Sequence, residues 1–226
     1  MIEAIFEAST WVVPIILAIT VHEAAHGWTA LRFGDDTAWQ LGRVTFNPIK
    51  HIDPVGTVLM PGLLLLSGLP PFGYAKPVPV RFDRLYNPKR DMIWVAAAGP
   101  GVNILMAIGG TLLLNMFAFS QGPLGEWLAQ MLVQLVWINI ILAVLNMIPL
   151  PPLDGGRVAV GLLPMPLAAK YARIEPFGIF IIFGLFLLPS VLHGLLGIDL
   201  NILAMIILPV AEFLYDLLLT VFFFAG

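Results

Sequence analysis

Residues 9–33 read STWVVPIILAITVHEAAHGWTALRF, an apolar run interrupted by His22, Glu23 and His26. A helix needs roughly 20 mostly apolar residues to cross the hydrocarbon core of a bilayer, and this run meets that length. Ionisable side chains are costly inside lipid, and those found there usually serve a function. The run therefore predicts a transmembrane helix that carries a functional site.

Four further stretches are long and apolar enough to span a membrane: residues 92–118, 128–150, 176–196 and 201–225. The chain of 226 residues is 59% hydrophobic and 11% charged, whereas a typical soluble domain is about half apolar and about a quarter charged. So few charges cannot cover a water-facing surface. The composition excludes a soluble globular enzyme and predicts an all-α polytopic protein with five transmembrane helices in a lipid bilayer.

The charge balance and the residue usage exclude further classes. The net charge is −3, and 11 Lys and Arg residues are too few to build a basic face, so we expect no nucleic-acid partner. Cysteine is absent, which excludes disulfides, thiolate metal ligands and a thiol nucleophile. The sequence carries no signal for an oligomeric state.

The Lys and Arg residues fall in two blocks, within residues 32–90 and 157–173. The N-terminal stub and residues 119–127 and 197–200 have none. Cytoplasmic loops of membrane proteins are enriched in Lys and Arg. We therefore expect an integral multi-pass protein with its N-terminus outside and its basic loops towards the cytoplasm.

Residues 55–69 form a shorter apolar segment with basic residues on both sides. If this segment crossed the membrane as a sixth span, its two basic flanks would lie on opposite faces. A re-entrant segment, which enters and leaves on one side, keeps both flanks cytoplasmic, and irregular backbone is tolerated at membrane depth when protein or a wet cavity surrounds it. We expect five spans plus this re-entrant segment.

A short alternating pattern follows the first span. In residues 41–46, LGRVTF, the apolar Val44 and Phe46 alternate with Arg43 and Thr45, which is typical of a β-strand. The pattern predicts a small membrane-associated β-hairpin. Val44 and Thr45 could clamp an extended substrate by strand addition, or the hairpin could lie at the interface without a partner.

The first span carries an HExxH motif at residues 22–26. Two histidines four residues apart on a helix share one face, and HExxH on a helix is typical of a zinc site with the glutamate as general base. Alternatively, the two histidines could pair with each other or with backbone carbonyls inside a bundle.

A catalytic zinc ion takes three protein ligands and one water, so a third ligand is needed. The best candidate is Asp154 in residues 146–156, NMIPLPPLDGG, where the prolines end a helix and force an extended turn. With residues 55–69 re-entrant, span 128–150 runs inward and Asp154 emerges on the same face as the histidines. The alternative is a loop in which Asp154 caps the next helix.

Three motifs in order, HExxH, AGPGVN at residues 98–103 and N-x-x-P-x-x-x-x-D-G ending at Gly155, resemble the site-2 protease family of intramembrane zinc metalloproteases. The match is to compact prokaryotic members, so we expect no PDZ or CBS domain. The resemblance implies that one Zn²⁺ ion is held by His22, His26 and Asp154. It implies that Glu23 is the catalytic base and that Asn146 lies near the reacting carbonyl.

The resemblance also implies an activity: hydrolysis of peptide bonds within or next to the transmembrane segment of a single-span membrane protein, in a prokaryotic cell membrane. We expect one transmembrane peptidase domain over residues 1–226, with a catalytic core at about 9–156 and C-terminal helices at 176–226. The candidate substrate-binding residues are Asn103, Val44 and Thr45.

Two other functions compete with proteolysis. A membrane metal transporter could use His22, Glu23, His26 and Asp154 as a transit site, but such a site does not need a base between two ligands. A non-catalytic scaffold with a structural zinc ion would want four protein ligands, and only three good candidates exist.

Overall fold

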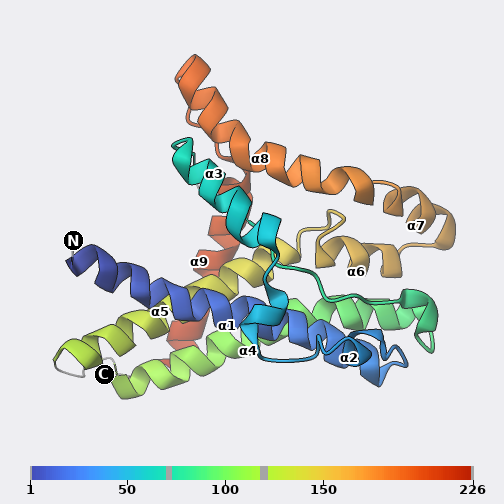
Figure 1. Ribbon diagram of the computed structural model, residues 1–226, viewed down its shortest axis with the longest axis horizontal. Helices are drawn as coiled ribbons and strands as arrows, with labels where there is room; N and C mark the ends of the chain where they lie inside the picture. The colour runs from blue at the N-terminus through green and yellow to red at the C-terminus, as the bar shows by residue number, and fades with distance from the viewer. Residues whose placement is uncertain (1, 70–72, 118–121, 225–226) are drawn as a thin grey trace.

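The computed structural model describes residues 2–69, 73–117 and 122–224 as a helical assembly (Figure 1). Its elements in chain order are α1 (Ile2–Arg32), α2 (Thr37–Gln40), η1 (Pro48–His51), η2 (Pro54–Leu59), α3 (Met60–Leu66), η3 (Phe82–Arg84), α4 (Pro88–Phe117), α5 (Pro123–Asn146), α6 (Asp154–Leu162), α7 (Met165–Ala172), α8 (Glu175–Leu196) and α9 (Ile202–Phe222).

Five of these helices are long and apolar enough to cross a membrane: α1, α4, α5, α8 and α9. Each coincides with one of the five predicted spans, so the prediction of an all-helical polytopic fold is confirmed. Residues 118 and 225, the predicted ends of two spans, lie outside the described residues.

The helices α1, α4 and α5 pack against one another and form the body of the bundle (Figure 1). Helix α9 crosses behind them and contacts α4 and α5. Small and branched side chains fill the junction of α4, α5 and α9, namely Ala107, Val136, Ile140, Ile207, Ala211 and Leu218. Helix α1 packs on α4 and α5. The HExxH motif lies on α1, the AGPGVN motif lies on α4, and the third motif begins at the end of α5.

Helix α8 touches the bundle at its first turns and then diverges from it (Figure 1). At the contact, a Cβ added to Gly178 would overlap the carbonyl oxygen of Pro151, so glycine is needed for this approach. The Arg157 guanidinium and the Glu175 carboxylate lie 3.6 Å apart beside it, and the Tyr171 hydroxyl donates to the Pro149 carbonyl. The turn before Asp154 therefore contacts Tyr171 of α7 and Gly178 of α8, and the pair of Arg157 and Glu175 joins α6 to α8 beside it.

The predicted β-hairpin at residues 41–46 is wrong, because no strand occurs within the described ranges 2–69, 73–117 and 122–224. The backbone N–H groups of Gly42 and Arg43 bond back to Trp39 and Ala38 instead of to a partner strand. The Thr45 hydroxyl then accepts from the Asn47 N–H group. These local hydrogen bonds form turns, and a period-two pattern over six residues supplied no second strand.

The structure does not support the predicted re-entrant segment at 55–69 either. Residues Pro54–Leu66 form a continuous apolar helix, η2 followed by α3, that is too short to count among the five spans. It projects away from α1 (Figure 1), and its leucines Leu63, Leu65 and Leu66 are exposed. Asp53 starts this helix, because its carboxylate accepts from the N–H groups of Val55 and Gly56.

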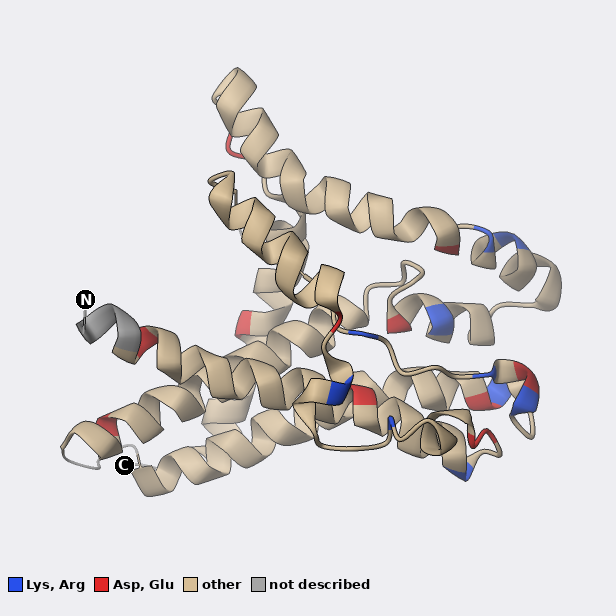
Figure 2. Cartoon of the chain, in the orientation of Figure 1, with Lys and Arg blue, Asp and Glu red and all other residues tan. Residues whose placement is uncertain are grey.

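Charge is distributed unevenly along the molecule. Figure 2 shows Lys and Arg on α6, α7 and the connections at that side of the molecule, whereas the N-terminal end of α1 and the start of α5 carry acidic residues. Acidic residues also lie among these Lys and Arg residues, so the two ends differ in where the cations occur.

Candidate active site

Three side chains from two distant parts of the sequence converge in the bundle. The Nε2 atoms of His22 and His26 on α1 lie 3.0 Å apart. The Oδ2 atom of Asp154, the first residue of α6, lies 3.2 Å from the first and 3.3 Å from the second. All three residues are buried, so bulk water does not separate these groups. Among the described residues, this is the group of His, Asp and Glu side chains arranged to hold a metal ion.

The geometry and chemistry of this triangle fit zinc. Tetrahedral zinc with ligands at about 2.0–2.1 Å keeps neighbouring ligand atoms about 3.3–3.4 Å apart, close to the observed spacings. The Asp154 Oδ2 atom is buried and has no hydrogen-bond donor, a state that is costly unless a cation binds it. Two imidazoles and a carboxylate are also ligands that zinc accepts.

The other ring nitrogen of each histidine is already engaged. His22 Nδ1 lies 2.6 Å from the Asn103 Oδ1 atom, and His26 Nδ1 lies 2.7 Å from the Val95 carbonyl oxygen. A carbonyl oxygen can only accept a hydrogen bond, so Nδ1 of His26 carries the proton. Its Nε2 lone pair is then available to a metal, which is the usual arrangement for metal-binding histidines.

Gly99 on α4 makes room for the two imidazoles. A Cβ built on this residue would lie 2.5 Å from His26 Nε2 and 2.6 Å from His22 Nε2. Any larger residue would therefore press on the very atoms that face the metal position. Gly99 of the AGPGVN motif thus leaves the space that the two imidazole rings occupy.

Asp154 owes its position to the turn that precedes it. The prolines of residues 149–152 end α5 as the sequence predicts, and α6 begins at Asp154. A Cβ on Gly155 or Gly156 would overlap the backbone at Met147 and Pro151, so the two glycines allow the close approach of α6 to the turn. Burial raises the pKa of Asp154, but the neighbouring imidazoles outweigh it and hold the pKa below its usual range.

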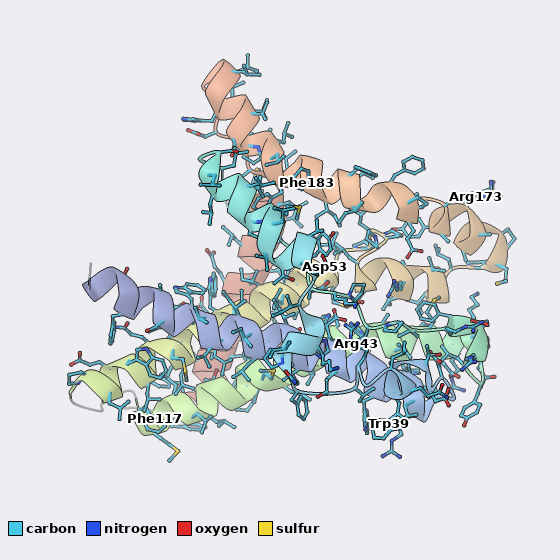
Figure 3. All side chains as sticks on the ribbon, viewed as in Figure 1. Trp39, Arg43, Asp53, Phe117, Arg173 and Phe183 are labelled. Carbon is cyan, nitrogen blue, oxygen red and sulfur yellow. The ribbon has the colours of Figure 1, made fainter. Side chains whose placement is uncertain are left out.

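Glu23, the predicted base, is partly buried and is held by a segment distant in sequence. Its Oε2 atom accepts a hydrogen bond of 2.7 Å from the backbone N–H group of Val78. The extended chain around Val78 is itself fixed, since Lys76 N–H donates to the His51 carbonyl and Arg43, labelled in Figure 3, donates to the Lys76 carbonyl. One oxygen of the carboxylate thus has a set position.

Asn103, expected among the substrate-binding residues, is fully buried and contacts His22. Its amide nitrogen also donates to the side-chain oxygen of Asn139 on α5, at 2.7 Å. Sequence reasoning missed Asn139, although an amide in an apolar span needs a partner and was a signal. The structure joins α1, α4 and α5 through these polar side chains.

Asn146 stands at the end of α5, and its amide donates to the Leu142 carbonyl one turn earlier, at 2.9 Å. Val44 and Thr45 line a groove of about 480 Å³ together with residues of α1 and α4. The remaining lining residues are Val21, Ala24, Ala25, Trp28, Phe46 and Val102. The groove therefore runs along the helix that carries both histidines.

The other histidines lie outside the triangle. His51 is buried, and its Nε2 atom bonds to the Thr45 carbonyl. The Nδ1 atom of the exposed His193 lies 2.7 Å from the Asp199 Oδ1 atom.

A helix-borne HExxH motif, a carboxylate on another helix within reach of both histidines and a set of membrane-spanning helices together define the class of integral membrane metalloproteases. Comparisons with known proteins agree with this class. The profile of peptidase family M50 matches residues 115–189. No solved structure matches the chain.

Three bacterial relatives carry names of the same kind. The Bacillus subtilis (strain 168) protein named "Putative zinc metalloprotease YwhC" is 39% identical over 182 residues, which cover 79% of this chain and 80% of that protein. A "Putative zinc metalloprotease Rip2" of Mycolicibacterium smegmatis is 30% identical over 62% of this chain and 52% of its own length. Its namesake in Mycobacterium tuberculosis (strain H37Rv) is 28% identical over 81% of this chain and 68% of its own length.

The chain belongs to peptidase family M50, the site-2 protease family. It is an integral membrane zinc metalloprotease that acts on membrane proteins. The transporter alternative is not favoured, because the matching family and the relatives are proteases.

Proposed function

We propose that His22, His26 and Asp154 hold one zinc ion and that Glu23 is the general base. The peptide bond that is cleaved lies within or next to the transmembrane segment of a single-span substrate. The observation that carries this assignment is the buried triangle of two Nε2 atoms and one Oδ2 atom, with sides of 3.0, 3.2 and 3.3 Å.

Zinc in such a site acts as a Lewis acid that polarises the peptide carbonyl and makes water more acidic. Glu23 accepts the proton of the attacking water and returns it to the leaving amine. The Val78 N–H group holds one carboxylate oxygen, which leaves the other for proton transfer. Asn146 donates to the developing oxyanion after its amide turns away from the Leu142 carbonyl, with which it bonds at rest.

The groove beside α1 supports a role of Val44 and Thr45 in binding substrate. Its wall includes Val21 and Ala25, each of which precedes a metal-ligand histidine in the sequence. A groove of about 480 Å³ with an apolar lining accepts apolar side chains of a substrate segment as it unwinds near the metal. Asn103, being buried against His22, serves the metal site.

The chain lies in a prokaryotic cell membrane with its N-terminus outside. The uneven charge supports this orientation, because Lys and Arg gather on the cytoplasmic side and are absent from the N-terminal stub. The zinc site then lies towards the cytoplasm. One peptidase domain spans the chain, with a catalytic core at about residues 9–156 and C-terminal helices at 176–226.

The test is cleavage of a single-span reporter protein by the chain reconstituted in liposomes. Glu23→Gln is expected to retain zinc and to lose at least about 10²-fold in rate, the usual contribution of a general base. His22→Ala is expected to lose both zinc and cleavage. Zinc-loaded Glu23→Gln that cleaves at the wild-type rate contradicts the assignment of the base.

A further inference from the structure

We propose that Asn139 is a positioning residue that acts through Asn103 to decide which nitrogen of His22 carries the proton, so that the Nε2 lone pair is left for the metal. The inference rests on the proposed zinc site. It adds to that site a residue on a third helix that touches neither the metal position nor the substrate groove.

The contact chain is continuous across three helices. Asn139 on α5 donates its amide N–H to the Leu135 carbonyl at 2.8 Å and accepts from Asn103 at 2.7 Å. Asn103 on α4 in turn accepts from His22 Nδ1 on α1 at 2.6 Å. The first two links fall within the usual range of an N–H···O hydrogen bond, about 2.7–3.2 Å, and the third is slightly shorter.

The Leu135 carbonyl, at one end of this series of hydrogen bonds, fixes the direction of every bond in the series. The Leu135 carbonyl can only accept, so the NH₂ group of Asn139 must face it and the Asn139 oxygen must face Asn103. The NH₂ group of Asn103 then points to Asn139, and also to the Ala18 carbonyl at 3.3 Å. The Asn103 oxygen is left for His22, so Nδ1 of His22 carries the proton and Nε2 offers its lone pair.

Burial makes this polarity hard to reverse. Asn103 and Asn139 are both 0% exposed and His22 is 7% exposed, so water cannot replace a lost partner. A reversed amide would place two donors or two acceptors face to face, and an unmatched buried polar group is strongly destabilising. The same burial prevents His22 from taking the other tautomer, which would point an N–H group at the cation.

The two histidines are thus oriented by different kinds of hydrogen-bond partner. His26 bonds directly to a backbone carbonyl, that of Val95. His22 has an amide as its partner, and an amide could face it with either end. Asn139 and Ala18 remove that ambiguity, and the shorter of their two contacts with Asn103 is that of Asn139.

The experiment measures zinc affinity by competition with a chelator, on the full chain purified in detergent. Partners that orient a metal-binding histidine typically change metal affinity about 10- to 100-fold. Asn139→Leu is expected to weaken zinc binding about 10-fold and Asn103→Leu by at least as much. Asn139→Asp, which still offers Asn103 an acceptor, is expected to lose less than Asn139→Leu.

Asn115→Leu is the matched control. Asn115 also lies on a long helix and also ties two helices, since its amide donates to the Phe222 carbonyl. Its loss is expected to lower the melting temperature and to leave zinc affinity unchanged. An equal loss of affinity in Asn115→Leu and Asn139→Leu would overturn the proposal, because it would trace the effect to general loosening.

A double variant and an NMR measurement test the proposal further. Because Asn139 acts through Asn103, Asn103→Leu with Asn139→Leu is expected to bind zinc as Asn103→Leu alone does; additive losses would overturn the relay. If Asn139→Leu does not fold, NMR of the histidine ring nitrogens in metal-free wild type decides, since protonation of Nε2 of His22 would refute the assignment. Wild type without zinc affinity would instead refute the proposed function.

Discussion

The substitution Gly99→Ala tests how closely the structure places the two imidazoles. The new Cβ would lie 2.5 Å from His26 Nε2 and 2.6 Å from His22 Nε2, whereas ordinary contact begins at 3.4 Å. The rings, or α4 as a whole, must therefore retreat by about 0.9 Å to relieve the overlap, while a metal site tolerates about 0.2 Å in its ligand distances.

We expect Gly99→Ala to lose zinc on dialysis and to cleave a single-span reporter at least about 10²-fold more slowly, as misplacement by about 1 Å commonly costs. Gly101→Ala is the matched control, because Gly101 lies on the same helix and a Cβ there meets no atom within 4 Å. That control should keep zinc and activity and gain up to about 1 kcal/mol of stability, since alanine favours a helix over glycine.

The assay is zinc content by mass spectrometry, together with cleavage and thermal unfolding in the same detergent. A folded Gly99→Ala protein that keeps one zinc ion per chain and the wild-type rate would refute the packing of α4 on the histidines. Loss of zinc in both variants would refute the explanation by steric overlap.

Four further outcomes follow from the same geometry. Asp154→Asn removes the negative ligand, so zinc affinity and cleavage should fall together, whereas unchanged affinity in a chelator titration would remove Asp154 from the ligand set. Gly178→Ala should lower both the melting temperature and the cleavage rate because its Cβ overlaps Pro151, while Gly184→Ala on the same helix, with open space around its Cβ, should do neither. Ala25→Leu should fill the groove and slow cleavage without changing zinc content; an unchanged rate would exclude the groove from substrate binding. Chelation should lower the melting temperature, since a ligand at 100 times its Kd stabilises by about 2.7 kcal/mol, and added zinc should restore it; an unmoved transition would contradict zinc binding to the folded state.

The sequence was sufficient for the parts of the fold that depend on hydrophobicity along the chain. The five spans need only length and apolar character, and the charges in the first span marked the site because lipid makes them costly. Asp154 could be noticed because the prolines before it end α5. Its placement on the same face as His22 relied on a re-entrant segment at 55–69, which the structure does not support.

The parts that depend on contacts between distant residues were not accessible. The turn at residues 41–46 was missed for another reason, because its bonds to Trp39 and Ala38 are local but a period-two pattern does not reveal them. The contact of Gly99 with the imidazoles requires knowing how α4 crosses α1. Asn139 could be noticed as an amide in an apolar helix, but its partner Asn103 lies 36 residues away.

X-ray absorption at the zinc edge of the purified wild-type protein tests the metal site most directly. We expect one zinc ion per chain with nitrogen and oxygen ligands at about 2.0–2.2 Å, including two imidazoles, and we expect this bound zinc to be absent from His22→Ala. A zinc ion bound without imidazole scattering, or a spectrum that His22→Ala leaves unchanged, would contradict this expectation.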